Sequence, residues 1–382
     1  MKPDLGIYYD MLDQIATTEP SLSFLSKQWP NVDEWRRQAR SKVLELLAFD
    51  PPNVPLNSWV ESNEVEDGIV REEISYDMPY GPRTHGFFLY PREHQRKMPA
   101  VIALHDHGSF FYFGKEKIVA THNEPKILNE FKQKNYGARS WATELAKRGF
   151  AVLAADVFLW GSRRIPIESV NEEFQKLFEG IEYGSDEYIR KYNDFWEINE
   201  CLMVVDTILN AGTSWPGIYS YDDRRSVDYL LTRKEIDPTR IACGGLSGGG
   251  LRSIFLTGLD ARIRCGFCVG FMTTIRGILR NHIRTPPLGH GLLMYAPQLF
   301  RFLDLPDIIS LHAPSPLMVQ CSIEDELFTL EGQREADQKI ADVYSKQGYP
   351  SNYVSKFHPG VHKFDTVMQG EVFNWLEKHL AH

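Results

Sequence analysis

The chain has 382 residues, of which 43% are hydrophobic and 24% are charged, which is the composition of an ordinary globular protein. Its 51 acidic residues outnumber its 42 basic residues, and the formal net charge of −9 argues against a binder of nucleic acid or of anionic membranes. No apolar run approaches the roughly 18 residues of a membrane span, and the first six residues lack the apolar core of a signal peptide, so we expect a cytoplasmic protein.

Residues 1–55 are predicted to form a helical N-terminal segment, followed by one catalytic domain over residues 56–382. Within the first segment, Asn31 and Glu34 have the spacing of a helix-capping pair, and apolar residues then recur at helical spacing until a double proline. The length is therefore better explained by one large domain with additions than by two domains of equal size.

A mostly parallel sheet is predicted for the rest of the chain. Two extended runs, 70–78 and 84–90, flank a Pro-Tyr-Gly-Pro turn and predict an antiparallel hairpin. From residue 99 onward, short continuous apolar runs are typical of strands buried on both faces. These runs are 99–104, 150–155, 241–246, 265–269 and 316–321, with helical patterns between them at 140–148, 222–233, 332–346 and 364–380. The pattern predicts an α/β fold with helices on both faces of the sheet.

Three segments are too long for the short connections of such a fold, namely 109–138, 162–200 and 271–315. We interpret them as lid-like insertions. Residues 165–200 hold ten acidic residues against three basic ones, so most of the net charge belongs to one insertion. The third insertion holds several arginines, among them Arg276 and Arg284, which could face an acidic substrate or simply form a solvated surface.

Five cysteines are too few and too scattered for a disulfide framework. Cys265 and Cys268 have the spacing of a metal or redox pair, but residues three apart on a strand point to opposite faces of the sheet. We therefore expect buried, reduced thiols.

The strongest local motif is Gly-Leu-Ser-Gly-Gly over residues 245–249, between an apolar strand and a helical segment. It matches the G-x-S-x-G nucleophile elbow, in which the serine occupies a tight turn and glycines two residues away on either side avoid collisions. The following helix directs its N-terminus at the serine oxygen. Ser247 is therefore the candidate nucleophile, and the alternative is a glycine-rich turn used only for close packing.

A serine nucleophile needs a base, and the base needs an orienting acid, in the chain order Ser, Asp or Glu, His. Asp325 follows the strand at 316–321 and is the candidate acid, with Glu324 as its competitor. His362 precedes the last helix and is the candidate base, with His358 as the alternative.

The loop after the first parallel strand reads His-Asp-His-Gly-Ser over residues 105–109. A backbone N–H of this loop, assigned to His107, is predicted to join the N–H of Gly248 in an oxyanion hole. The two histidines around Asp106 also permit a metal site, but the remaining histidines lack the paired spacing that a hydrolytic metal requires, so we expect no metal and no cofactor.

Asp156 ends the strand predicted at 150–155, and Trp160 follows it in the next loop. Because ligands bind at the carboxyl ends of parallel strands, Trp160 is a candidate wall of the substrate pocket. The alternative is a structural Asp–Arg pair that holds this loop in place.

These motifs resemble the α/β-hydrolase superfamily, and within it the dienelactone hydrolase-like and acetyl xylan esterase-like serine hydrolases. The matching stretches are 99–108, 137–164, 222–250, 317–328 and 360–380, so the resemblance covers most of the chain from about residue 60. It implies an α/β-hydrolase fold and the triad Ser247, Asp325 and His362. The chain departs from the family in three ways. Dienelactone hydrolase uses a cysteine nucleophile where this chain has Ser247, and the second residue of the family's oxyanion loop is commonly glycine where this chain has Asp106. Acetyl xylan esterases typically have glutamine after the nucleophilic serine, where this chain has Gly248.

The function predicted from the sequence is a serine esterase that cleaves a carboxylic ester through an acyl-enzyme, on an acylated carbohydrate or another small ester. A peptidase or acyltransferase with the same triad is one alternative, and a non-catalytic hydrolase-like binding protein is another. The partner expected is a small-molecule ester, and the sequence is compatible with a homo-oligomer.

Overall fold

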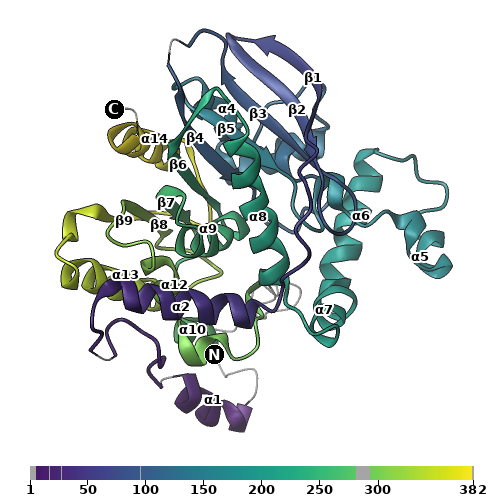
Figure 1. Cartoon of the computed structure of the whole chain (residues 1–382). Helices are drawn as coiled ribbons and strands as arrows, with labels where there is room; N and C mark the ends of the chain where they lie inside the picture. Colours follow the sequence, from purple (N-terminus) through teal and green to yellow (C-terminus); the bar gives the residue numbers. More distant parts are fainter. Residues whose placement is uncertain (1–5, 17, 27, 95, 281–292, 381–382) are drawn as a thin grey trace.

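The computed structural model describes residues 6–16, 18–26, 28–94, 96–280 and 293–380. Within these ranges, nine strands form one sheet in the order β1-β2-β3-β5-β4-β6-β7-β8-β9 (Figure 1). Their bounds are β1 Trp59–Glu66, β2 Ile69–Tyr76, β3 Thr84–Pro91, β4 Met98–Leu104, β5 Ala151–Ala155, β6 Ile236–Leu246, β7 Ile263–Val269, β8 Leu317–Ser322 and β9 Tyr353–His358. The strands β5, β4, β6, β7, β8 and β9 pair in parallel, and β1, β2 and β3 add an antiparallel edge.

The predicted hairpin is therefore confirmed as β2 and β3, and all five apolar runs are parallel strands. The pattern missed β1. Its side chains are largely exposed and include Asn and several Glu, so β1 lacks the apolar alternation by which strands are recognised. Pairing with β2, rather than burial of its own side chains, places it in the sheet.

Helices cover both faces of the parallel strands, as the sequence predicts. On one face, α4 (Trp141–Ala146) and α14 (Thr366–Leu380) pack against Val101 and Val152. On the other face, α8 (Trp215–Leu231) and α9 (Gly248–Leu259) pack against Ile102 and Cys243, and α13 (Leu330–Lys346) packs against Val319. Successive residues of one strand thus lie in different cores, because side chains alternate across a sheet.

The N-terminal segment contributes α1 (Tyr9–Ala16) and α2 (Val32–Leu47). Asn31 caps α2 and accepts a hydrogen bond from the N–H of Glu34 at 2.8 Å, as the capping pair predicts. Trp35 and Val43 on the apolar stripe of α2 are buried in the same core as α8, α9 and α13. The helix α2 is therefore packed onto the helices that cover this face of the sheet.

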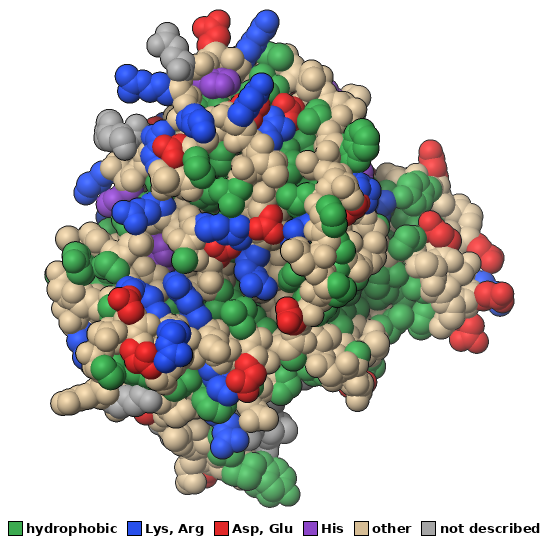
Figure 2. Space-filling model, in the orientation of Figure 1, with side chains coloured by type: hydrophobic (Ala, Val, Ile, Leu, Met, Phe, Trp, Pro, Cys, Tyr) green, Lys and Arg blue, Asp and Glu red, His purple; other side chains and the backbone are tan. Residues whose placement is uncertain are grey.

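The three long segments contain short helices. The first holds η2 (Lys115–Lys117) and α3 (Lys126–Tyr136), and the third holds α10 (Ile275–Arg280), α11 (Leu299–Phe302) and α12 (Leu305–Ser310). The second holds η3 (Gly161–Arg163), η4 (Ile167–Ser169), α5 (Glu172–Lys176) and α6 (Asp186–Asn199), which continues as a π-helical turn, η5 (Glu200–Val205), and α7 (Asp206–Asn210). Figure 2 shows acidic side chains gathered on the lobe to which α5 belongs.

Residues 281–292, which include Arg284, lie outside the described residues. Arg276 forms a 3.7 Å ion pair with Asp13 of α1, so it serves a contact between helices. Cys265 and Cys268 lie in different cores on opposite faces of the sheet, and none of the five cysteines forms a disulfide. Among the described residues, no helix has the length and apolar character needed to cross a membrane.

Candidate active site

Ser247 occupies a strained turn between β6 and α9. Its φ of 57° and ψ of −120° lie outside the regions that non-glycine residues ordinarily adopt. The turn is held by a 2.8 Å hydrogen bond from the N–H of Ser247 to the carbonyl of Val269, at the end of the neighbouring strand β7. This geometry lifts the serine to the carboxyl edge of the sheet, as a nucleophile elbow requires.

The glycines around Ser247 are required by close approach of the backbone. A Cβ atom on Gly245 would lie 2.0 Å from the carbonyl oxygen of Leu104, and one on Gly249 would lie 2.2 Å from the same atom. A Cβ atom on Gly248 would lie 2.7 Å from the backbone nitrogen of His107. The elbow is therefore pressed against the end of β4, which confirms the steric reason for the G-x-S-x-G spacing.

His362 and Asp325 are brought together from loops after β9 and β8. The Nδ1 atom of His362 lies 2.8 Å from Oδ2 of Asp325, and the side chain of Asp325 is fully buried. The other carboxylate oxygen of Asp325 accepts the N–H of Leu327 at 2.9 Å. Glu324 is exposed, and its backbone N–H binds the carbonyl of Gly360. Of the two competing acids, Asp325 is thus the one in contact with His362.

The free edge of the His362 ring lies beside the elbow. A Cβ atom on Gly270 would lie 3.0 Å from Cε1 of His362 and 3.1 Å from the side chain of Leu246, the residue before Ser247. The Nε2 atom of His362 is buried and has no hydrogen-bond partner among the described residues. His358, the alternative base, instead forms a 3.2 Å ion pair with Glu371 of α14.

The electrostatic surroundings favour the protonated form of His362. Burial lowers the pKa of this imidazole, but the hydrogen bond to Asp325 and the negative charges of Asp325 and Glu326 outweigh it, so the pKa lies above its ordinary value of 6.5. An imidazole with a raised pKa is a stronger base toward a serine hydroxyl, and Asp325 holds it in the tautomer with the proton on Nδ1.

The loop after β4 places the backbone nitrogen of His107 against Gly248, next to the elbow. The His107 side chain points away from the elbow toward the second insertion, where Nε2 lies 2.9 Å from Oε2 of Glu200. Nδ1 of His107 accepts the N–H of Ser109 at 3.0 Å, so in the neutral ring the proton is on Nε2 and is donated to Glu200. Glu200 is not predicted from the sequence, where its only signal is its place at the end of an acidic insertion.

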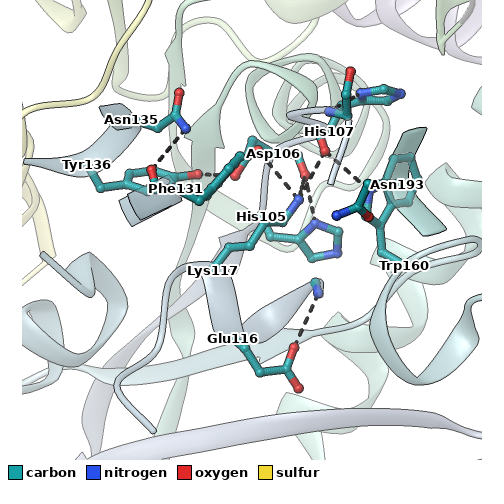
Figure 3. A network of polar contacts seen from close by, with 12 residues as sticks. His105, Asp106, His107, Glu116, Lys117, Phe131, Asn135, Tyr136, Trp160 and Asn193 are labelled. Atoms are coloured by element: carbon teal, nitrogen blue, oxygen red, sulfur yellow. Dashed lines mark hydrogen bonds and ion pairs between the residues drawn. The ribbon is translucent and has the colours of Figure 1, made fainter. Parts of the chain in front are cut away.

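A second buried group, also missed, surrounds Asp106 (Figure 3). The hydroxyl of Tyr136 donates to one carboxylate oxygen of Asp106, and the ammonium of Lys117 lies 3.4 Å from the other. Lys117 also donates to the carbonyl oxygens of Asp106 and His107. A lysine in a helical turn normally indicates a solvent-exposed position, so the sequence contains no cue for this burial.

Trp160 is buried beside the same loop. Its indole N–H lies 3.3 Å from the carbonyl of His107, and its ring is stacked between Phe111 at 5.3 Å and Trp215 at 5.7 Å. Asp156 accepts hydrogen bonds from Ser162 and from the backbone and side chain of Lys115. Asp156 therefore holds this loop in place, as the alternative interpretation proposed, but its charged partner is Lys115 rather than an arginine.

No group of three or more His, Cys, Asp or Glu side chains suited to a metal ion occurs within the described ranges. Of the two loop histidines, His107 binds Glu200, and Nδ1 of His105 lies 3.0 Å from the carbonyl of Asp106. The two rings thus have separate partners.

A mostly parallel sheet, a serine elbow after β6, an acid after β8 and a histidine after β9 define the α/β-hydrolase fold, and the chain has this fold. No protein-family model matches the chain. Over 349 residues it is 26% identical to "putative hydrolase YtaP" of Bacillus subtilis (strain 168), covering 90% of this chain and 100% of that protein.

Solved structures with the same fold include esterases. A "putative acetyl xylan esterase" from Bacteroides fragilis NCTC 9343 aligns with a TM-score of 0.68 at 19% identity, over 92% of this chain and 81% of that chain. A glucuronoyl esterase from Solibacter usitatus aligns with a TM-score of 0.64 at 15% identity, over 95% of this chain and 98% of that chain. At these identities the likeness establishes the fold, and the chemistry has to be argued from the site.

Proposed function

We propose that this protein is a serine hydrolase that cleaves carboxylic esters, with Ser247 as nucleophile, His362 as general base and Asp325 as the acid that orients it. The observation that most supports the proposal is that one site contains both a serine in a strained elbow and an imidazole whose Nε2 is buried. That imidazole is bound to a carboxylate through Nδ1 and has a free Nε2. A binding module has no use for a serine held at a strained φ or for an unpartnered basic nitrogen.

In the proposed mechanism, Oγ of Ser247 attacks the ester carbonyl carbon while Nε2 of His362 takes its proton. The negative charge that develops on the carbonyl oxygen is bound by the backbone N–H groups of Gly248 and His107. Collapse of the tetrahedral intermediate expels the alcohol, which receives the proton from His362. Water then attacks the acyl-enzyme with His362 again as base, and the carboxylic acid leaves.

We further propose that the substrate is an acylated carbohydrate or another small ester. The support is the likeness of this chain, over 92% and 95% of its length, to proteins named as a putative acetyl xylan esterase and a glucuronoyl esterase. A panel of acetylated sugars, uronate esters, short p-nitrophenyl esters and lactones, assayed on one preparation, separates these classes. Trp160 remains the candidate for a pocket wall, and its replacement by alanine should raise KM for the best substrate of that panel.

The nucleophile is tested by labelling with a fluorophosphonate. The wild type should take up the label and hydrolyse p-nitrophenyl acetate, and Ser247→Ala should do neither while unfolding at the same temperature. Ser253→Ala is a matched control, because this buried hydroxyl on α9 donates to the carbonyl of Gly250 and contacts neither Asp325 nor His362. Undiminished labelling of Ser247→Ala would remove Ser247 from the mechanism.

We also propose a cytoplasmic location. It is supported by five cysteines that form no disulfide, because thiols persist where the environment is reducing. Fractionation of cells that carry a tagged copy tests this, and recovery outside the cytoplasmic fraction would contradict it.

A further inference from the structure

We propose that Lys117 is a positioning residue of the oxyanion hole, holding and polarising the peptide unit that presents the N–H of His107 to the substrate. This inference rests on the proposed esterase function, and it adds a role for a residue in the first insertion. Figure 3 shows Lys117 reaching the turn formed by Asp106 and His107.

The ammonium of Lys117 is bound almost entirely by the oxyanion loop. The side chain is fully buried, at 0% exposure. Its Nζ donates to the carbonyl of Asp106 and, at 3.1 Å, to the carbonyl of His107, and it lies 3.4 Å from the carboxylate of Asp106. A buried cation is costly unless it is paired and hydrogen-bonded, so such a set of contacts points to a specific task.

The geometry of the peptide unit connects these contacts to catalysis. In a trans peptide, the C=O of Asp106 and the N–H of His107 point in opposite directions. Because Lys117 binds the oxygen, the N–H is directed away from it, and the nitrogen packs on Gly248 at the elbow. Neither this N–H nor that of Gly248 donates to a described residue, so both are free to bind an oxyanion.

The positive charge behind the peptide has a second effect. It draws electron density toward the carbonyl oxygen and so makes the N–H on the other side a stronger donor. It also adds a positive potential at the oxyanion that is little screened, because rings of Phe131 and Trp160 lie 5.6 and 6.0 Å from the ammonium. Fixed dipoles and charges of this kind stabilise a transition state without reorganising.

Neighbouring side chains hold Lys117 and the loop after β4 in position. Tyr136 of α3 donates to the Asp106 carboxylate and so fixes the counter-ion of Lys117. Arg252 of α9 binds the preceding carbonyl, that of His105, at 3.0 Å and is itself paired with Asp223. Three consecutive carbonyl oxygens, those of residues 105–107, are therefore held by buried cations, and the direction of the intervening N–H groups is set.

The pKa of Lys117 places the loss of its charge at a pH that kinetic measurements can reach. Burial lowers the pKa of Lys117 to about 8, and Asp106 and Asp156 oppose this effect while Arg252 adds to it. His105, which also faces this ammonium, has its pKa held well below 6.5 by burial and by the nearby cations, so it stays neutral. Loss of the Lys117 proton should weaken the oxyanion hole on the alkaline side.

The test compares Lys117→Met with Lys132→Met on p-nitrophenyl acetate. Lys132 is a matched control, because it is a buried lysine that binds a carbonyl, that of Val119, and a carboxylate, that of Glu124, away from the oxyanion loop. We expect kcat to fall about 10²-fold in Lys117→Met with KM little changed, in the range measured for loss of an oxyanion donor. Equal kcat values in the two variants would overturn the proposal.

Two further measurements apply even if Lys117→Met fails to fold. In the wild type, kcat should fall as the pH rises through about 8, and a flat profile to pH 9.5 would overturn the proposal. In Lys117→Arg this alkaline limb should disappear, because a guanidinium stays protonated, and its persistence would assign the limb to another group. If the wild type hydrolyses no ester at all, the proposed function fails; if it does and Lys117 is neutral to kcat, only this inference fails.

Discussion

Two histidine–carboxylate pairs lie in loops at the carboxyl edge of the sheet, and the second ring nitrogen of the histidine differs between them. In the loop after β9, His362 binds Asp325 at 2.8 Å, and in the loop after β4, His107 binds Glu200 at 2.9 Å. The distances are nearly equal, and each of the four side chains is at most 10% exposed. The pairs differ in what the other ring nitrogen does.

Nε2 of His362 has no partner among the described residues, whereas Nδ1 of His107 accepts the N–H of Ser109. The first imidazole can therefore exchange a proton with a reactant, and the second has both nitrogens engaged. A histidine beside a carboxylate can act as a base only when its far nitrogen is free to take a proton. A pair with both nitrogens bound instead holds two segments together, here the oxyanion loop and the second insertion.

The largest effect is expected when each histidine is truncated. His362→Ala should lose about 10⁶-fold in kcat on p-nitrophenyl acetate with a nearly unchanged unfolding temperature. His107→Ala should keep its backbone N–H and lose far less activity per folded molecule, but be destabilised by about 3 kcal/mol, because Glu200 is left buried without a partner. Calorimetry and kinetics on both variants measure this. Similar losses of kcat in His362→Ala and His107→Ala would contradict the different roles proposed for the two histidines.

A smaller effect is expected when each carboxylate is made neutral. Asp325→Asn should lower kcat by about 10⁴-fold, because an amide no longer fixes the working tautomer or stabilises the imidazolium. Glu200→Gln should lower kcat by less than about tenfold, because the amide oxygen still accepts the proton of His107 Nε2. The ratio of the two kcat values tests the comparison, and a loss in Glu200→Gln that matched Asp325→Asn would give Glu200 a direct part in the chemistry.

The smallest effect concerns pH. The base must be neutral, and its pKa is raised, so kcat/KM should fall as the pH drops through a value above 6.5. Glu326, whose charge contributes to the raised pKa, accepts the N–H of His362 at 3.2 Å. In Glu326→Gln the acid limb should move to lower pH by about half a unit.

Glu324→Gln is the matched control for the pH measurement, since Glu324 is an exposed neighbour that does not contact His362. Its acid limb should coincide with that of the wild type when kcat/KM is recorded from pH 5 to 8. A limb that stays in place in Glu326→Gln, or a flat profile down to pH 5, would contradict the role given to His362.

The strands and the serine elbow could be predicted from the sequence, because each is encoded by a local pattern of residues. Short apolar runs marked the parallel strands, because burial on both faces demands continuous apolar side chains. The motif around Ser247 marked the elbow, because a strained turn pressed against Leu104 tolerates only glycine at Gly245 and Gly249. Chain order and the positions after predicted strands nominated Asp325, with Glu324 as its competitor, and His362, and the structure brings Asp325 and His362 into contact.

The packing of segments far apart in the chain determines which polar residues gather around these elements. Glu324 and Asp325 are adjacent and chemically alike, and the path of the loop after β8 determines which one faces His362. Lys117, Tyr136 and Glu200 come from two insertions whose sequences resemble ordinary solvated helices, and no local pattern records that they converge on Asp106 and His107. The physical reason is that a backbone conformation is encoded by neighbouring residues, whereas burial of a charge depends on partners far away in the chain.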